Sequence, residues 1–193
     1  MGIGMKKIAI ATLLVLLSGC DRKSEAPFGV EWNDRSRSVS SLGLPTFNKI
    51  PLRGDWVILY VTTPPKESFN IEGAYNFLYK NDRLKRITFN TYDLTGLDSI
   101  DKSKHIYNEL KKILTERYGT PKEVNEHVYN DDFSFFPCVT NTNCGKWESV
   151  FSHENYTGKL YIGMGESKSG YSDRRVSGRV HVEFSLNGDS LSP

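Results

Sequence analysis

Three cysteines and four histidines are the residues of this chain best able to do chemistry, and Cys20 has the most informative surroundings. It follows an apolar run over residues 8–17 and the small pair Ser18-Gly19, with Lys6-Lys7 in front. A charged start, an apolar run and small residues at its end are the layout of an export signal. The run is about 10 residues long, whereas a permanent membrane span needs roughly 20. Cys20 therefore lies where a signal would be cut, with its thiol open to covalent modification.

The motif Leu17-Ser18-Gly19-Cys20 resembles a lipobox, the processing site of bacterial lipoproteins. This resemblance implies a signal peptide over residues 1–19. It also implies that Cys20 becomes the first mature residue, with an S-diacylglycerol thioether on its thiol and palmitate on its amino group. The alternative is a plain secretory cleavage site with an incidental cysteine. Two or more acyl chains give stable anchoring, so lipid on Cys20 would hold the domain at a membrane.

Asp21 is the residue that bears on whether the lipidated protein stays in the inner membrane or moves to the outer membrane. In the enterobacterial lipoproteins that this start resembles, an aspartate after the lipidated cysteine keeps the protein in the inner membrane. The resemblance thus implies a lipid-anchored protein on the periplasmic side of the cell inner membrane. Otherwise Asp21 is simply the first polar residue of the tether, which we assign to residues 20–26. One periplasmic domain is expected over residues 27–193.

Cys138 and Cys144 are the two remaining cysteines, separated by a polar, turn-rich segment. In an oxidising compartment such a pair is expected to form a disulfide. A redox pair and half of a metal site are the other readings. Redox motifs of the thioredoxin kind use C-x-x-C, and a zinc site needs further ligands nearby, so a structural disulfide is favoured.

The histidines have no spacing with a known catalytic or metal-binding logic. They are His105, His127, His153 and His181. The pairs His153-Glu154 and His181/Glu183 fall in predicted strands and could converge, or they could simply face solvent. The sequence therefore predicts no catalytic residue, no metal and no cofactor.

A second cluster combines the acids Asp131-Asp132 with Phe133, Phe135 and Phe136. The acids could form a paired-carboxylate site or a solvated turn. The aromatic side chains fall outside any periodic element, and they could form a partner surface or cover one end of the core. A hydrolase would need such groups to meet in one pocket.

The elements that would position these residues indicate an α+β fold, a mostly antiparallel sheet with one long helix packed on a face. The long helix is expected over residues 99–118, because apolar residues recur at helical spacing and Gly119 and Pro121 end it. A short helix is expected over 35–42, with Asp34 as its N-cap. Strands are expected over 56–62, 74–80, 84–92, 146–153, 159–165 and 179–186.

The balance of basic and acidic residues indicates which kinds of partner the protein can have. The chain has 25 Lys and Arg against 23 Asp and Glu, and the two lysines of the expected signal account for the difference. A nucleic-acid binder would show a basic excess, and a membrane-surface protein a polybasic run. Neither is visible along the sequence, so we expect attachment by lipid and no nucleic-acid partner.

The function expected is that of a non-enzymatic envelope interaction or binding module, with an envelope protein as one kind of partner. The domain shows a general resemblance, through Pro27-Phe28-Gly29 and the Tyr118-Gly119-Thr120-Pro121 segment, to small enterobacterial and prophage-type lipoproteins of unknown function. A periplasmic hydrolase and an assembly factor for a membrane protein are the alternatives. Overproduction is expected to induce envelope stress, because a disulfide and a non-local sheet form slowly.

Overall fold

The computed structural model describes residues 24–41, 48–63, 65–129, 135–141, 143–165 and 177–188. The expected signal peptide, Cys20 and Asp21 lie outside the described residues. Asp131, Asp132 and Phe133 lie outside them too. Among the described residues, no helix has both the length and the apolar character needed to cross a membrane.

The described part of the chain consists of many strands and a few helices. The strands are β1 (Glu25–Ala26), β2 (Val30–Glu31), β3 (Asn48–Pro51), β4 (Trp56–Val61), β5 (Gly73–Lys80), β6 (Arg83–Thr91), β7 (Leu94–Thr95), β8 (Glu123–Val128), β9 (Gly145–Ser152), β10 (Tyr156–Met164) and β11 (Ser177–Leu186). The α-helices are α1 (Ser36–Ser41), α2 (Ser99–Tyr118) and α3 (Phe135–Val139), with a 3-10 turn over Pro27–Gly29.

One large antiparallel sheet carries the fold. Its strands run in the order β3-β4-β5-β6-β11-β10-β9-β8, with β7 paired to β11, while β1 and β2 form a separate small hairpin. The β5–β6 turn consists of Asn81 and Asp82, both with positive φ, which matches the twist of a tight hairpin. The expectation of an α+β protein built on a mostly antiparallel sheet is confirmed.

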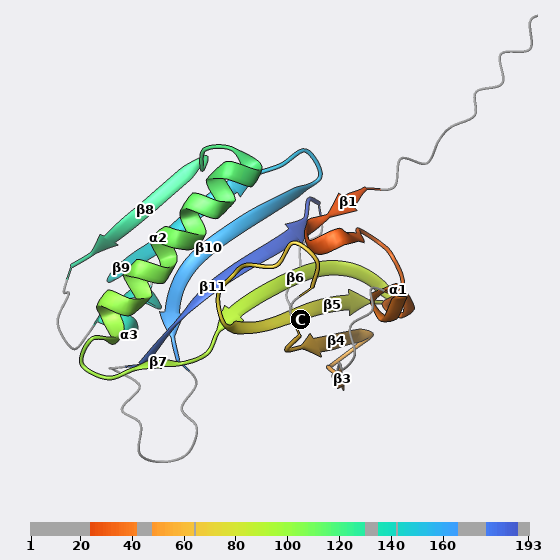
Figure 1. Ribbon diagram of the computed structural model, residues 1–193, viewed down its shortest axis with the longest axis horizontal. Helices are drawn as coiled ribbons and strands as arrows, with labels where there is room; N and C mark the ends of the chain where they lie inside the picture. The colour runs from red at the N-terminus through yellow and green to blue at the C-terminus, as the bar shows by residue number, and fades with distance from the viewer. Residues whose placement is uncertain are drawn as a thin grey trace, which may run out of the picture.

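Helix α2 begins and ends where its sequence pattern predicts. Gly119 follows it with a φ of 84°, and its N–H donates to the carbonyl of Thr115. Tyr107, Leu110 and Leu114 are buried in the main core. The helix contacts β9, β10 and β11, and in Figure 1 it runs between β8 and β10, in front of β9.

Helix α3 decides between the two alternatives for Phe135 and Phe136. Phe135 and Phe136 are fully buried, so these two side chains extend the core and do not form an exposed partner surface. Phe136 lies so close to Gly178 that a Cβ at that position would be 1.9 Å from the Phe136 ring. Cys138 on the same helix is bonded to Cys144, with an S–S distance of 2.03 Å. The short helix, its disulfide and β11 thus close one end of the core.

Other differences arise where the local pattern is weak. β8 is missing from the predicted strands because its side chains are mostly exposed and polar, so no apolar alternation marks it. Glu25 and Ala26, which we placed in the tether, pair with β2. The N-terminus of α1 is capped not by Asp34 but by Asp82, whose Oδ1 accepts from the Ser36 backbone N–H at 3.0 Å and from its hydroxyl at 2.6 Å.

The segment that follows the tether is held by aromatic packing. Phe28 has a φ of 68°, which an aromatic residue rarely adopts, yet it is buried. Its ring makes edge contacts with Phe69, Tyr75 and Phe184, with centroids 5.2–5.9 Å apart. Burial of this ring in the aromatic core offsets the backbone strain and fixes the start of the domain on the sheet.

Candidate functional site

The structure does not bring the predicted histidines together. His153 stacks on Tyr156 with centroids 4.4 Å apart, and His181 stacks on Tyr161 at 4.7 Å. Those two tyrosines are five positions apart on β10, which is about 16 Å along a strand. Within the described part of the chain, no group of three or more His, Cys, Asp or Glu could hold a metal.

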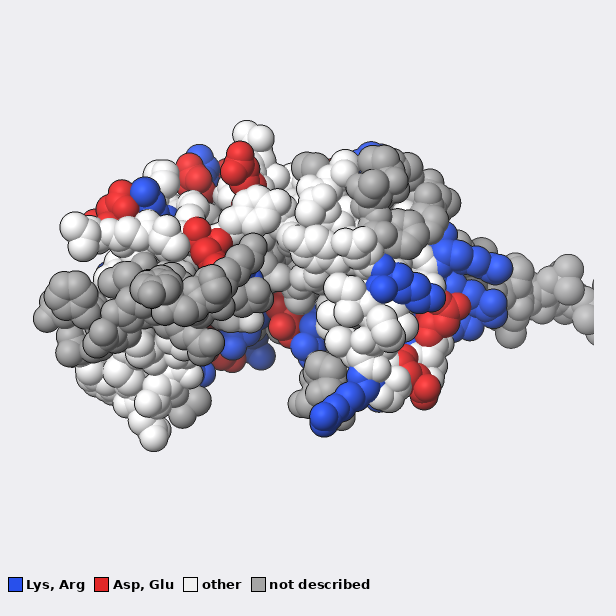
Figure 2. All heavy atoms as spheres, turned by 90° about the horizontal axis from the view of Figure 1, so that it is seen from below, with Lys and Arg blue, Asp and Glu red and all other residues white. Residues whose placement is uncertain are grey.

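Polar side chains instead gather on the face of the sheet opposite the main core, called here the open face. The strand register places Asn76 opposite Thr88, Thr88 opposite Glu183, and Glu183 opposite Lys159 on this face. The buried side chains of the described helices belong to the core on the other face. Figure 2 shows the molecule hollowed on the open side, with acidic and basic side chains in the hollow.

Ion pairs cross the middle of the open face. Lys159 Nζ lies 2.8 Å from one oxygen of Glu148, and Lys146 Nζ lies 3.1 Å from the other. Burial raises the pKa of Glu148, but its hydrogen bonds to the two lysines and their charges outweigh burial and hold that pKa below its ordinary value. On the far side of Lys159, Glu183 lies 3.4 Å from Arg86 Nε. These pairs neutralise one another, so the open face is polar without a large net charge.

His181 lies near the centre of the open face. Its Nδ1 is 2.6 Å from Oδ1 of Asn90, and its ring is nearly parallel to that of Tyr161. Burial and, to a smaller extent, the charge of Arg179 lower the pKa of His181 to about 4, although the charge of Asp93 acts in the opposite direction. The ring is therefore neutral at pH 7, and Nδ1–H donates to the Asn90 amide oxygen.

Stability should depend on pH through His181. An unfolded histidine has a pKa near 6.5, so between that pH and about 4 the unfolded chain binds more protons than the folded one. The free energy of unfolding should be undiminished above pH 6.5 and fall by about 2 kcal/mol on going to pH 4.5. We expect His181→Gln to lose this part of the pH dependence in urea denaturation. An equal change in the variant and the wild type would contradict the assignment.

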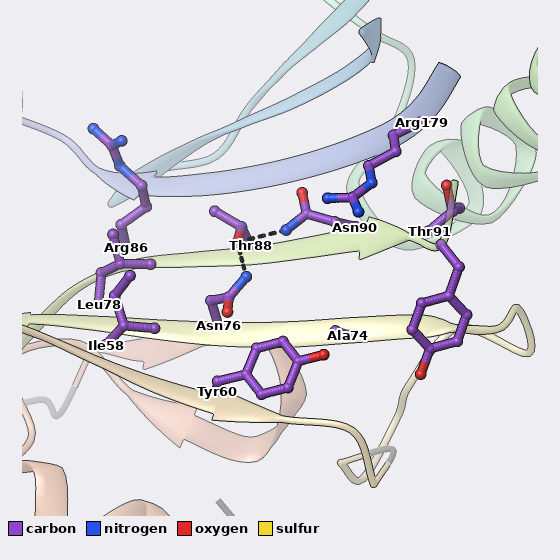
Figure 3. Close-up of a pocket in the computed structure, with 11 residues that line it drawn as sticks. Ile58, Tyr60, Ala74, Asn76, Leu78, Arg86, Thr88, Asn90, Thr91 and Arg179 are labelled. Atoms are coloured by element: carbon purple, nitrogen blue, oxygen red, sulfur yellow. Dashed lines mark hydrogen bonds between the residues drawn. The ribbon is translucent and has the colours of Figure 1, made fainter. Parts of the chain in front are cut away.

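A pocket of about 410 Å³ opens on this face over β4, β5, β6 and β11. A row of amide and hydroxyl groups crosses it: Asn76 Nδ2 donates to Thr88 Oγ1 at 3.0 Å, and Asn90 Nδ2 approaches the same oxygen at 3.4 Å. Figure 3 shows this row with Arg86 and Arg179 at its two ends. The described residues that line it are Ile58, Tyr60, Ala74, Asn76, Leu78, Arg86, Thr88, Asn90, Thr91, Tyr92 and Arg179.

The chemistry of this lining suits binding. Amides and a hydroxyl orient a ligand by hydrogen bonds, while the Tyr60 and Tyr92 rings and the aliphatic side chains supply apolar contact. Among the described residues of this lining there is no Ser, Cys, Lys, Asp, Glu or His that could form a nucleophile–base pair. Our sequence reading missed this pocket, although polar residues 76, 88 and 90 alternate with buried ones in predicted strands, a pattern that marks a second, polar face.

Comparison of the chain with protein-family models, with curated proteins and with solved structures gave no match. The function has to be argued from the site and the sequence motifs.

Proposed function

We propose that this chain is an envelope lipoprotein, anchored by lipid on Cys20 to the periplasmic side of the inner membrane, whose domain is a non-enzymatic binding module. The motif that ends at Cys20 and the aspartate after it support the address. In this proposal the one long helix, α2, covers one face of the sheet, and the opposite face is left for a ligand or an envelope protein. Overproduction would then cause slowly folding protein to accumulate in the envelope and would induce the envelope stress response.

The observation that carries the binding role is the pocket on the open face. Sheet faces in small domains are normally either covered or evenly polar, whereas this one has a hollow whose floor includes Ala74 and Leu78, both largely buried. Convergent polar groups over an apolar floor are the usual composition of a ligand site.

The two alternatives have less support. A hydrolase built from the predicted strand residues would need His153 and His181 in one pocket. His153 lies in the β9–β10 turn and stacks on Tyr156, whereas His181 lies on β11 and stacks on Tyr161. An assembly factor that used the Phe135 and Phe136 side chains would need them exposed, and both are buried.

Photo-crosslinking in cells would test the pocket. Tyr92 lines it and is 49% exposed, whereas Tyr129 is 75% exposed and lies outside it. With benzoylphenylalanine at either position, we expect a light-dependent adduct of defined mass from position 92 and none from position 129. Asn76→Leu keeps the side-chain size but removes the central amide, and should abolish the adduct.

Equal adducts from positions 92 and 129 would show general crowding and contradict a specific site. An adduct that persists at full yield in Asn76→Leu would show that the polar row does not take part in binding.

A further inference from the structure

Basic side chains that are scattered along the sequence gather at one end of the folded domain. This basic end is formed by the exposed residues Arg35, Arg37, Lys49, Arg53, Lys80 and Arg83. Figure 1 places α1, the β5–β6 turn and the β1–β2 hairpin at this same end, and Figure 2 shows Lys and Arg side chains concentrated there.

Contacts around the β5–β6 turn position four of these residues, Arg83, Lys80, Arg35 and Lys49. Arg83 Nη1 donates to the Asn33 carbonyl at 3.0 Å, and Lys80 Nζ lies 5.4 Å from the Trp56 ring centroid. Asp82 in the turn has its pKa lowered, chiefly by its hydrogen bonds to Ser36, and also by the charges of Arg35 and Lys49.

The acidic side chains at this end do not cancel its charge. Asp34, Asp55 and Asp82 lie among the six basic residues, which leaves a surplus of positive charge. Glu25 and Glu31, which pair across the β1–β2 hairpin, reduce that surplus, so six basic residues stand against five acidic ones among the described residues of this end. Because the whole domain is close to neutral, this local surplus gives it a charge asymmetry.

The start of the domain is directly connected to the basic end. The Ser24 carbonyl accepts from the Trp32 N–H at 2.8 Å, and the next residue, Asn33, bonds to both Leu84 and Arg83. Four peptide units separate Cys20 from Ser24, and such a segment reaches at most about 14 Å. A lipid on Cys20 would therefore hold this end of the domain close to the headgroups.

We infer that the basic end docks on anionic phospholipid headgroups of the bilayer that holds the lipid anchor. This inference rests on the proposed lipidation of Cys20 and adds an orientation to it. Guanidinium and ammonium groups pair with headgroup phosphates, and each basic residue near an anionic surface strengthens binding about fivefold. The anchor keeps the domain at the surface, and the basic end determines which side faces it.

Lipid crosslinking from two exposed apolar residues tests this orientation without altering a charge. Ile50 lies beside Lys49 and is 43% exposed, whereas Leu97 is 95% exposed and precedes α2 at the other end of the domain. The mature lipidated protein, with benzoylphenylalanine at either position, is reconstituted in vesicles of phosphatidylcholine alone or of phosphatidylcholine with phosphatidylglycerol, and the lipids of both kinds of vesicle carry a radioactive label. We expect the lipid adducts from position 50 to exceed those from position 97, and to rise about fivefold or more with phosphatidylglycerol.

Charge reversal supplies the matched variants. Arg37→Glu with Lys80→Glu should abolish the rise, whereas Lys102→Glu with Lys112→Glu, the same charge change on exposed positions of α2, should preserve it. High salt should also suppress the rise, because the headgroup contacts are screened.

Mass analysis of the N-terminal peptide separates the two ways to fail. Absence of lipid on Cys20 would contradict the proposed function itself. A lipidated protein whose position 50 gives the same adducts in both vesicles, or that responds equally to both double variants, would contradict the docking inference alone.

Discussion

Cys20→Ala is expected to abolish lipid labelling of this protein completely. The thioether needs a free thiol, and the other two cysteines are joined to each other, with Cys138 only 2% exposed. The variant should accumulate either as uncleaved precursor or as protein that is no longer found in the inner membrane. Palmitate labelling followed by membrane fractionation measures both effects.

The matched control for this substitution is Asp21→Ser, one residue further along. It keeps the thiol, so labelling should be unchanged, while the mature protein should shift from the inner to the outer membrane. A Cys20→Ala variant that still incorporates palmitate would rule out the lipobox. A labelled Asp21→Ser protein that stays in the inner membrane would show that another feature sets the address.

Phe136→Ala should lower the free energy of unfolding by about 3–5 kcal/mol, as removal of a buried Phe side chain usually does. The ring is fully buried, packs edge-on against Phe135 with centroids 5.3 Å apart, and fills the space above Gly178. A loss of this size would unfold much of a marginally stable domain at physiological temperature. Urea denaturation of the wild type and the variant measures it.

Tyr129→Ala is the control for that experiment, since its side chain is 75% exposed and should change stability by less than about 0.5 kcal/mol. If Phe136→Ala were as mild as the control, the α3 aromatics would not be core residues, and the partner-surface reading would return.

The sequence predicts those helices and strands in which apolar residues recur on the one face that is buried. Helix α2 matches its prediction at both ends, because a helical apolar stripe is followed by Gly119 and Pro121. The β5–β6 hairpin was accessible for the same reason, since Tyr75, Phe77 and Tyr79 alternate on one face before a tight turn. Elements whose stability depends on distant partners could not be predicted in this way: β8 is mostly polar and exposed, and α3 is only five residues long.

By itself, the sequence determined the secondary structure of the strongly periodic segments, the near-neutral charge and the motif at Cys20, because each of these is local along the chain. Only the tertiary structure decided which polar residues share a surface. Asn76 and Asn90 reach one pocket through the register of β5 and β6. The cap that Asp82 gives to α1 brings Arg35 to the β5–β6 turn, which Lys80 and Arg83 flank. Strand register and long-range caps depend on contacts between segments tens of residues apart, so no window of the sequence contains them.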